Sequence, residues 1–289
     1  MRILLAVDAS PDSRQAAQVI AHLAAPPELH VLNVVDLAAL KHAYPSLEAG
    51  AGLLETYRKE VSEAAERILH EMKAELTPHA ARIRLIADTG DAAESIIQTA
   101  EETGADLVVL GQRGLTANPA FLLGGVSQKV ATYAPCSVLV VKTPVPSLDR
   151  LLLAVDGSDA SKKTARFLAG HPFRGRPHLT VVTAWPVQRP NSFGRVTGGR
   201  DLSDAARAAR TEGEALLKDV AARLQQAYEV ETEWLQGDPA FAILEAAARS
   251  QAQVIVLGAR GLTGIKRFLL GSVSQKVLVH APCSVLIVR

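Results

Sequence analysis

Two stretches of this chain join glycines to a segment that begins a helix, and that combination suits the binding of a phosphate group. The first, GQRGLTANPAFLLGGVSQKV, runs from Gly111 to Val130, and the second, GARGLTGIKRFLLGSVSQKV, runs from Gly258 to Val277. Glycines let the backbone approach a ligand closely, and the N–H groups exposed at a helix start favour an anion. Each stretch is therefore predicted to form a phosphate cradle from a strand exit, a loop and a helix start.

The second stretch holds the more complete set of donors. Gly271 and Ser272 open its predicted helix, so their backbone N–H groups and the Ser272 hydroxyl can donate to phosphate oxygens. In the first stretch Gly125 replaces the serine, which removes the hydroxyl and keeps the backbone N–H and the helix dipole. One lost contact to a charged group is worth about 1.5 to 3 kcal/mol, or roughly a 10- to 100-fold difference in affinity. We therefore expect the second copy to be the better site.

Several basic side chains accompany the two stretches. Arg113 and Arg260 lie between the first two glycines of each stretch and are well placed to reach a ligand. Lys266 and Arg267 have no cationic counterpart in the first copy, but adjacent basic residues in a surface loop are usually only solvated, and we favour that interpretation. The two arginines are therefore included in the predicted sites.

A lysine stands in the first turns of the helix that follows each stretch, Lys129 in the first copy and Lys276 in the second. The helix dipole disfavours a cation there unless something anionic lies nearby. The two lysines therefore lend mild support to an anion site, although neither is predicted to be a ligand.

An aspartate is predicted at the same edge of the sheet. The run AVDGSDAS brings Asp156 directly after the first strand of the second copy. A carboxylate there can accept hydrogen bonds from a ribose or an adenine amino group, or it can satisfy backbone N–H groups of its own loop. Position alone leaves both roles open. Ser158 is instead predicted to be the N-cap of the next helix.

The elements that position these residues come from a tandem duplication. A fixed offset relates the two stretches, LLAVDAS is matched by LLAVDGS, and APCSVLVV is matched by APCSVLIV. A chain of 289 residues is long enough for two domains of about 150 residues each. We predict one domain over residues 1–143 and another over 149–289, with the segment KTPVPSLDR as the linker.

Within each copy, short β-branched runs alternate with longer segments of helical period, a pattern typical of an α/β fold with a parallel sheet. Asp238 before Pro239, and Asp91 with Glu94, predict helix N-termini. Ligands of such sheets bind beyond the carboxyl ends of the strands, where the strand order reverses, and the glycine stretches follow that edge. The predicted first-copy strands are 2–7, 29–35, 82–88, 106–111 and 137–142, with helices at 11–24, 53–76, 92–103 and 125–133; the second-copy strands are 151–155, 178–184, 229–235, 253–258 and 284–288.

Composition narrows the class of protein. With 48% hydrophobic and 21% charged residues the chain has the composition of a soluble globular protein, and a net charge of +1 gives no field that would recruit nucleic acid or an anionic membrane. No apolar run approaches the roughly 18 residues of a membrane span, and the N-terminus has no cleavage-site pattern. We therefore expect a cytoplasmic protein without nucleic-acid or membrane partners.

Other conspicuous residues are expected to be structural. Cys136 and Cys283 are too few for a disulfide framework or a zinc site and are predicted to be buried thiols. Trp185 and Trp234 lie at strand ends, where packing at the core edge is favoured over base stacking. The segment 188–203 is predicted to be a loop between the second strand and its helix.

The complete pattern resembles the universal stress protein family. The motif G-x2-G-x9-G-[S/T] follows the fourth strand, VD-x-S ends the first, APC-x-VL-x-V marks the last, and the two copies cover essentially the whole chain. The resemblance implies two five-stranded α/β domains of strand order 3-2-1-4-5, the adenine nucleotide alpha hydrolase-like fold. It also implies a stress-response role and, in the nucleotide-binding branch, ATP held with little hydrolysis, with Mg²⁺ left open as its companion. Lone domains of the family pair through their last strands, so it implies an intrachain pseudo-dimer and leaves a homodimer of chains open.

The resemblance also supplies the site residues. Asp156 would contact the nucleoside, the backbone of Ala184 would meet adenine, and the glycine motif would hold ribose and phosphates. No catalytic residue is assigned, and the metal ligands are left unknown. The predicted binding residues of the second copy are Asp156, Ala184, Gly258, Arg260, Gly261, Gly271, Ser272, Val273 and Ser274; those of the first copy are Asp8, Val34, Gly111, Arg113, Gly114, Gly124, Gly125, Val126 and Ser127.

Three other functions stay open. The chain can be an interaction module with one or both sites empty, and Gly125 makes the first copy a candidate for that role. It can be an adenylating enzyme, although the SGG-type opening of the pyrophosphate loop in those enzymes is absent here. A receiver domain is disfavoured because no fitting aspartate follows the third strand.

Overall fold

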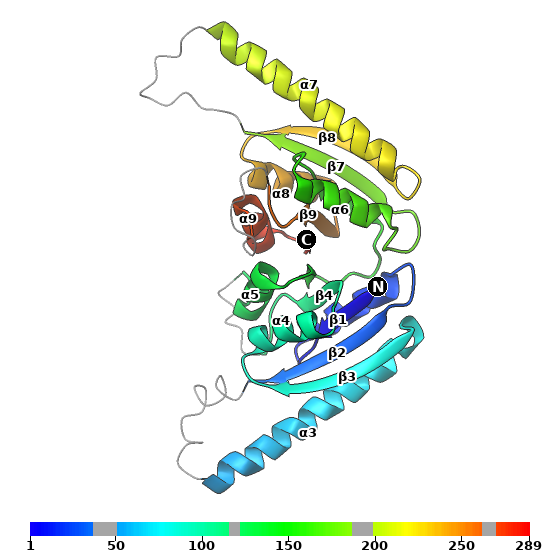
Figure 1. Cartoon of the computed structure of the whole chain (residues 1–289), viewed down its shortest axis with the longest axis vertical. Coiled ribbons are helices and arrows are strands. Elements are labelled where there is room, and N and C mark those ends of the chain that lie inside the picture. The colour runs from blue at the N-terminus through cyan, green and yellow to red at the C-terminus, as the bar shows by residue number, and fades with distance from the viewer. Residues whose placement is uncertain (37–50, 116–121, 187–198, 262–269) are drawn as a thin grey trace. The chain divides into compact units, whose positions relative to one another are not determined.

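The computed structural model describes residues 1–36, 51–115, 122–186, 199–261 and 270–289 (Figure 1). The chain divides into two compact units, of which the first holds Met1–Ser147 and the second begins at Leu148. The division falls inside the KTPVPSLDR segment that was predicted to be the linker. Lys266 and Arg267, the pair of basic residues that the sequence offers as possible phosphate contacts, lie outside the described residues.

Unit 1 alternates strands and helices as its periodicity predicts. The strands are all parallel and follow the order β3-β2-β1-β4-β5, so the order reverses between β1 and β4. The elements are β1 (Arg2–Ala6), α1 (Pro11–Gln18), η1 (Val19–His22), β2 (Glu28–Val35), α3 (Ala51–Leu76), η3 (Thr77–His79), β3 (Arg82–Thr89), α4 (Ala92–Glu102), β4 (Leu107–Gly111), α5 (Gly125–Tyr133) and β5 (Ser137–Val141).

Unit 2 repeats this plan. Its parallel strands follow the order β8-β7-β6-β9-β10, with the reversal between β6 and β9. Both units therefore confirm the predicted α/β class and the strand order 3-2-1-4-5. The elements are β6 (Arg150–Ala154), α6 (Asp159–Ala169), β7 (His178–Trp185), α7 (Gly199–Leu224), β8 (Glu229–Gln236), α8 (Pro239–Arg249), β9 (Val254–Gly258), α9 (Ser272–His280) and β10 (Ser284–Val288).

The core of each unit lies on the inner strands. Every residue of β4 and β9 is buried, and both strands read as continuous apolar runs, LVVLG and VIVLG. Such runs are expected where helices cover both faces of a parallel sheet. The edge strands β3 and β8 are more exposed and carry alternating polar residues. The buried inner strands thus hold the strand ends that carry the glycine stretches.

Among the helices whose N-caps the structure describes, four begin with a side-chain cap. Asp238 accepts a hydrogen bond from the Phe241 N–H at 3.1 Å, with Pro239 at the first helical position. Asp91 accepts from the Glu94 N–H at 2.9 Å. Ser158 begins α6 in the same way, and Ser10 begins α1. The three caps predicted from sequence, those of α4, α6 and α8, are confirmed.

The structure differs from the predicted elements in a few places. The α-helix predicted over 11–24 ends at Gln18 and continues as the 3₁₀ turn η1 to His22. Pro26 disfavours helical backbone at Ala25 and so limits how far this segment can extend, but it does not explain the change at Val19. The helix α7 starts at Gly199, so the last residues of the predicted loop 188–203 are helical.

Two predictions about conspicuous side chains need correction. Trp185 is 42% exposed because it ends β7 at the rim of the sheet, so its predicted packing at the core edge is wrong. Cys283 is buried as predicted, whereas Cys136 is only half-buried. Trp234 does pack, since a Cβ on Gly213 of α7 would lie 2.8 Å from its indole ring.

Candidate functional site

The glycine turn of unit 2 brings the end of β9 to the start of α9. The Gly271 N–H donates to the Ala259 carbonyl at 2.8 Å, and the Gly271 carbonyl accepts from the Gln275 N–H at 2.9 Å. Gly271 is therefore the N-cap, and it has no side chain to cover the first-turn N–H groups. Those N–H groups belong to Ser272, Val273 and Ser274, and a helix provides no acceptor of its own for them.

Unit 1 has the same turn. The Gly124 N–H donates to the Gln112 carbonyl at 3.0 Å, and its carbonyl accepts from the Gln128 N–H at 3.0 Å. Gly124 is the N-cap of α5, again with no side-chain cap. Because α1, α4, α6 and α8 are all capped by serine or aspartate, α5 and α9 stand out among the described α-helices whose starts are resolved in detail. Their open first turns can accept an external anion.

The aspartate after each first strand lies against the second glycine of the motif. A Cβ on Gly261 would lie 2.6 Å from Asp156 Oδ2, and a Cβ on Gly114 would lie 2.7 Å from Asp8 Oδ2. A side chain at either glycine would displace the carboxylate, so glycine is what allows the aspartate to lie against the loop. The structure thus brings the first-strand exit and the glycine loop together in both units.

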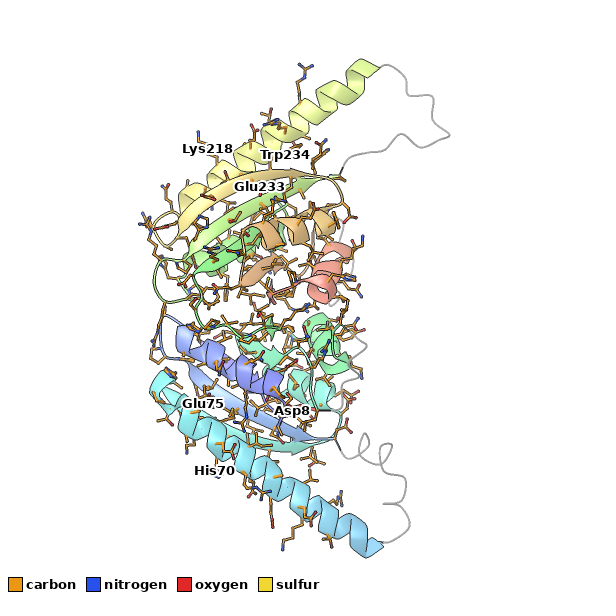
Figure 2. All side chains as sticks on the ribbon, turned by 180° about the vertical axis from the view of Figure 1, so that it is seen from behind. Asp8, His70, Glu75, Lys218, Glu233 and Trp234 are labelled. Atoms are coloured by element: carbon orange, nitrogen blue, oxygen red, sulfur yellow. The ribbon has the colours of Figure 1, made fainter. Side chains whose placement is uncertain are left out.

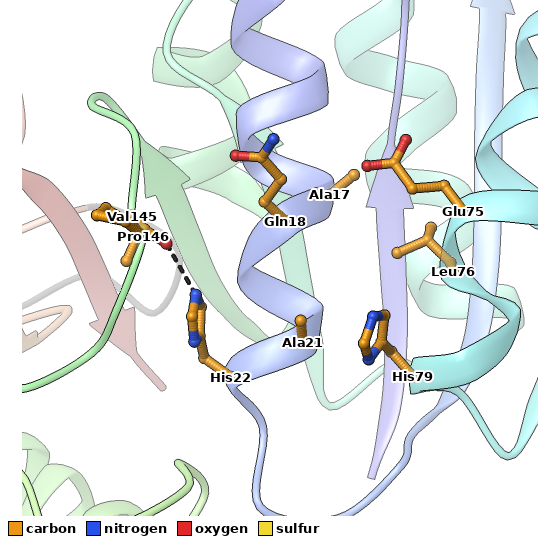
Figure 3. A pocket seen from close by; sticks show the side chains of 9 residues that line it. All are labelled: Ala17, Gln18, Ala21, His22, Glu75, Leu76, His79, Val145 and Pro146. Atoms are coloured by element: carbon orange, nitrogen blue, oxygen red, sulfur yellow. Dashed lines mark hydrogen bonds between the residues drawn. The ribbon is translucent and has the colours of Figure 1, made fainter.

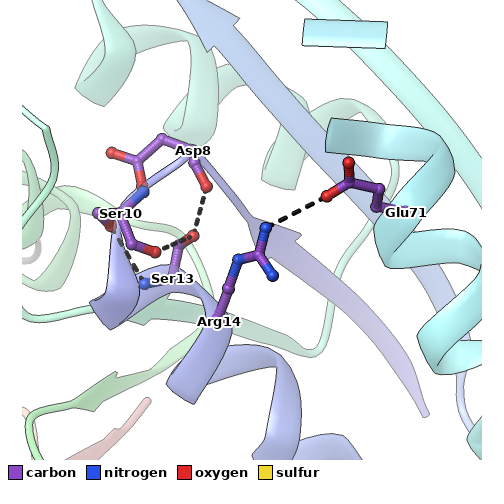
Figure 4. A network of polar contacts seen from close by, with 5 residues as sticks. All are labelled: Asp8, Ser10, Ser13, Arg14 and Glu71. Atoms are coloured by element: carbon purple, nitrogen blue, oxygen red, sulfur yellow. Dashed lines mark hydrogen bonds and ion pairs between the residues drawn. The ribbon is translucent and has the colours of Figure 1, made fainter. Parts of the chain in front are cut away.

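The carboxylate of Asp8 is used to hold these two loops. Its Oδ1 accepts from the Ser10 N–H at 2.9 Å, and its Oδ2 accepts from the Leu115 N–H at 3.0 Å. Its backbone carbonyl accepts from the Ser13 hydroxyl at 2.6 Å (Figure 4). Asp156 likewise accepts from the Ser158 N–H at 3.0 Å. Both aspartates therefore play the loop-fastening role that the sequence left open, and their contact with a nucleoside stays a prediction.

The first glycine of each motif allows close packing of a strand end on a helix. A Cβ on Gly258 would lie 2.8 Å from the Ala160 Cβ of α6, and a Cβ on Gly111 would lie 2.7 Å from the Asp12 carbonyl carbon of α1. Gly125 differs, because a Cβ there would meet nothing within 4 Å. Packing thus requires glycine at the two strand ends, whereas it does not require glycine at position 125.

The predicted phosphate-binding serines inside the last helices are buried. The Ser274 hydroxyl donates to the Gly258 carbonyl at 2.8 Å, and the Ser127 hydroxyl donates to the Gly111 carbonyl at 2.7 Å. A phosphate oxygen needs that same hydrogen, so these hydroxyls do not face a ligand as they stand. They fix the helix start to the strand end, and only their backbone N–H groups belong to the open turn.

The lysines of the last helices have partners within the protein. Lys276 Nζ lies 3.2 Å from Asp238 Oδ2, and Lys129 Nζ lies 3.5 Å from Asp91 Oδ2. The N–H groups of the capped helices and these lysines hold the pKa of both aspartates below its ordinary value, the backbone hydrogen bond being the larger cause. The anion that offsets each lysine is therefore an N-cap carboxylate, and the lysines give no support to a phosphate site.

The remaining predicted residues lie at the same edge of each sheet. Val34 and Ala184 are half-buried near the ends of β2 and β7. Arg113 and Arg260 are half-buried in the glycine loops. The backbone N–H of Arg113 donates to Asp12 Oδ2 at 3.1 Å. Val126, in the open first turn of α5, is 39% exposed.

Sequence reasoning missed Asp12. It lies in the first turn of α1 and contacts the glycine loop of unit 1, and the matching position against Gly258 in unit 2 is Ala160. Alignment of the two copies could have found it, because the aspartate of the first copy is aligned with an alanine in the second. Self-comparison reveals a difference, but it does not show that the difference lies at the glycine loop.

Two surface hollows lie away from the glycine turns. One, of about 260 Å³, lies between α1, the end of α3 and Val145, whose carbonyl is 2.8 Å from His22 Nε2 (Figure 3). The other, of about 680 Å³, lies between α7 and β8 and is lined by Lys218, Glu233 and Trp234 among others (Figure 2). Within the described ranges no three His, Cys, Asp or Glu side chains gather as a metal site, and no helix is long and apolar enough to cross a membrane.

Comparison with known proteins agrees with the repeated geometry. The model of the universal stress protein family matches the chain twice, over residues 1–142 and 147–289. The chain belongs to the universal stress protein family. Membership supports a role in stress response for this universal stress protein.

Individual relatives show the same division. A universal stress protein of Thermus aquaticus is 38% identical over 140 residues, which is 48% of this chain and 97% of that protein. A universal stress protein of Mycolicibacterium smegmatis is 27% identical over 303 residues, covering 99% of this chain and 96% of the relative. This chain is therefore similar to another member along nearly its full length.

Solved structures agree on the fold. A universal stress protein from Archaeoglobus fulgidus DSM 4304 superimposes with a TM-score of 0.67 at 21% identity, covering 100% of this chain and 98% of that one. A protein of unknown function from Pseudomonas aeruginosa PAO1 gives a TM-score of 0.65 at 19% identity, covering 99% and 92%. At this identity the likeness concerns the fold of this universal stress protein alone.

Proposed function

We propose that this universal stress protein is an ATP-binding regulatory protein whose working site is the glycine turn of unit 2. The observation that carries the proposal is the open first turn of α9, whose N-cap is Gly271. It follows β9 at the point where the strand order reverses, which is where α/β sheets bind ligands. A phosphate group bound there would receive backbone N–H donors and the favourable end of the helix dipole.

The donors of unit 2 suit the phosphates of a nucleotide. The N–H groups of Ser272, Val273 and Ser274 form the open turn, and the Ser272 side chain is exposed and can add its hydroxyl. By the family resemblance, Ala184 would offer its backbone to adenine and Asp156 would lie beside the nucleoside. Mg²⁺ would accompany the phosphates in this proposal without a protein carboxylate being assigned to it.

We expect little hydrolysis at this site. The groups that the motif supplies are backbone N–H groups and a hydroxyl, which bind phosphate but do not remove a proton from an attacking water. Bound ATP would act by stabilising one state of the protein, because a ligand shifts the population toward the state it prefers. The adenylating enzyme is the rival here, and an assay for pyrophosphate release separates the two.

Unit 1 is proposed to be the weaker site or an interaction module. Gly125 removes the hydroxyl that Ser272 supplies. Apolar side chains are also exposed around the turn, with Leu115 at 66% and Leu122 at 55% exposure. Exposed apolar residues suit contact with a protein partner better than a phosphate. The pairing of last strands, the homodimer and the cytoplasmic location stay predictions.

The test is an ATP titration of the wild type and of Gly271→Val. A Cβ at Gly271 would lie 3.4 Å from the Arg260 Cα, so branched methyls would crowd the turn and close the phosphate cradle. Protein purified without added ATP is first examined for co-purified nucleotide, and binding is then measured by calorimetry. We expect the wild type to bind and Gly271→Val to lose at least roughly 10-fold in affinity.

The matched control is Gly124→Val, the same change at the N-cap of α5. It should leave the affinity of unit 2 unchanged. Circular dichroism checks that both variants stay folded. If neither the wild type nor the control binds ATP, the ATP proposal is wrong and the interaction module is the better description.

A further inference from the structure

The two units differ at one position that faces the glycine loop. In unit 1, the first strand-end glycine, Gly111, packs on Asp12, whose carbonyl carbon and Cβ would lie 2.7 and 2.9 Å from an added Cβ. In unit 2, Gly258 packs in the same way on Ala160, whose Cβ and carbonyl carbon would lie 2.8 and 3.0 Å away. The equivalent contacts identify Asp12 and Ala160 as occupants of one place in the fold. One bears a carboxylate and the other a methyl group.

The carboxylate of Asp12 is directed at the glycine loop. Its Oδ2 accepts a hydrogen bond from the backbone N–H of Arg113 at 3.1 Å. The Cα of Arg113 in turn lies 3.4 Å from the position that a Cβ on Gly124, the N-cap of α5, would take. The Asp12 carboxylate therefore contacts the loop residue that packs against the N-cap of α5. Asp12 lies in the first turn of α1, so the dipole of its own helix stabilises the negative charge at this place.

At the position that matches Asp12, unit 2 has no charge. Ala160 is apolar, and the nearest acidic neighbour in sequence, Asp159, points to solvent with its side chain 93% exposed. Asp159 Oδ1 also lies 3.2 Å from Lys162 Nζ. The aspartates after the first strands, Asp8 and Asp156, are common to both units and do not distinguish them. Among the described residues, Asp12 is thus an acidic group held against the glycine loop of unit 1 at a position where unit 2 has an alanine.

We propose that Asp12 determines specificity by excluding phosphate-bearing ligands from unit 1, so that the chain binds one nucleotide, in unit 2. Asp12 supplies an anion from the protein itself to the loop, and its charge repels a phosphate approaching the first turn of α5. This inference rests on the proposed function, because the repulsion matters where a nucleotide phosphate is the ligand. Asp12 would then weaken phosphate binding in unit 1 in addition to the loss of the hydroxyl at Gly125. The two contributions can be separated by mutation.

The first experiment asks whether removing the charge opens unit 1. Asp12→Ala, which copies unit 2, is made in the Gly271→Val background so that binding reports unit 1 alone. ATP and inorganic tripolyphosphate are titrated as probes. We expect the affinity of unit 1 for both to rise by roughly 10-fold or more, because a like charge held against the glycine loop is removed.

A conservative variant separates charge from packing. Asp12→Asn keeps a side-chain oxygen that can accept from the Arg113 N–H while it removes the charge. If repulsion is the cause, Asp12→Asn should gain affinity as Asp12→Ala does. A gain by neither variant overturns the proposal, and a gain by Asp12→Ala alone shows that space and not charge is decisive, which also overturns it.

The reciprocal experiment places the charge in unit 2. Ala160→Asp should weaken ATP binding by roughly 10-fold, since Gly258 leaves the space that Gly111 leaves for Asp12. Ala169→Asp is the control, because it adds the same charge to the exposed far end of the same helix, α6. Thermal unfolding checks that both variants fold.

The outcomes distinguish the inference from the proposed function. ATP binding by the wild type that survives Ala160→Asp, together with no gain in Asp12→Ala, overturns the inference and leaves the proposed function in place. Absence of binding from the wild type and from every variant overturns the proposed function and the inference with it. Absence of binding from the wild type with a gain in Asp12→Ala supports the exclusion of phosphate by Asp12 and overturns the proposed site in unit 2.

Discussion

The glycines of the repeated stretch differ in how much the packing of the fold requires them. At Gly111 a side chain would enter the first turn of α1, and at Gly258 the first turn of α6, since a Cβ would lie within 2.8 Å of Asp12 or Ala160. At Gly125 a Cβ would meet nothing within 4 Å. Packing against α1 and α6 thus explains why both copies have glycine at the strand end. At position 125 there is room for other residues.

Gly111→Ala is predicted to lower the free energy of unfolding by about 1 to 3 kcal/mol, because the backbone of α1 must move to admit the methyl group. Gly125→Ala is the control and should leave stability unchanged or raise it slightly, since alanine restricts the unfolded chain. Chemical denaturation followed by circular dichroism measures both. Equal losses in the two variants would contradict the packing explanation.

At the scale of elements, each unit joins its last two helices by one pair of side chains. Asp238 caps α8 and also lies 3.2 Å from Lys276 of α9, and Asp91 of α4 pairs with Lys129 of α5 in unit 1. The ion pairs are exposed, so most of the stabilisation should come from the N-cap hydrogen bond. The helix that carries the open turn is thereby fixed to its neighbour.

Asp238→Ala is predicted to cost about 1 kcal/mol of stability at neutral pH, the usual value of an N-cap. The Phe241 N–H, and after it Lys276, hold the pKa of Asp238 below its ordinary 3.8. A group with a lowered pKa in the folded state stabilises the protein above its unfolded pKa and loses that effect as pH falls through the folded value. The difference between wild type and variant should therefore shrink below about pH 3.8.

Denaturation at pH 7 and at pH 3 measures this difference. Lys276→Met serves as the control, because it removes the ion pair, keeps the cap, and should cost no more than about 0.5 kcal/mol. A difference between wild type and Asp238→Ala that stays constant with pH would show that the carboxylate charge contributes nothing.

At the scale of the whole molecule, two similar units are expected to respond differently to one ligand. ATP at about 100 times its Kd should stabilise the unit that binds it by about 2.7 kcal/mol. Hydrogen exchange should therefore slow at the end of β9 and the first turn of α9, and stay unchanged at β4 and α5. Gly271→Val should abolish the protection. Equal protection of both units would contradict a single working site.

The duplicated α/β fold was predictable from the sequence because its signals are local. The alternation of β-branched runs with helical periods gave the elements, and the caps at Asp91, Ser158 and Asp238 marked helix starts. Where local signals were weak the predictions were less accurate. The start of α7 and the exposure of Trp185 depend on how far a helix or strand extends past the sheet, which no short pattern encodes.

By itself the sequence determined the tandem fold and the position of the two glycine turns, because turn residues and periodicity act over a few positions. Only the tertiary structure decided which polar groups are already used within the protein. Ser274 donates to Gly258, Lys276 pairs with Asp238, and Asp12 reaches Arg113, which lies 101 positions away in the chain. Hydrogen bonds and ion pairs form between groups that folding brings together, so their partners cannot be read from neighbours in sequence.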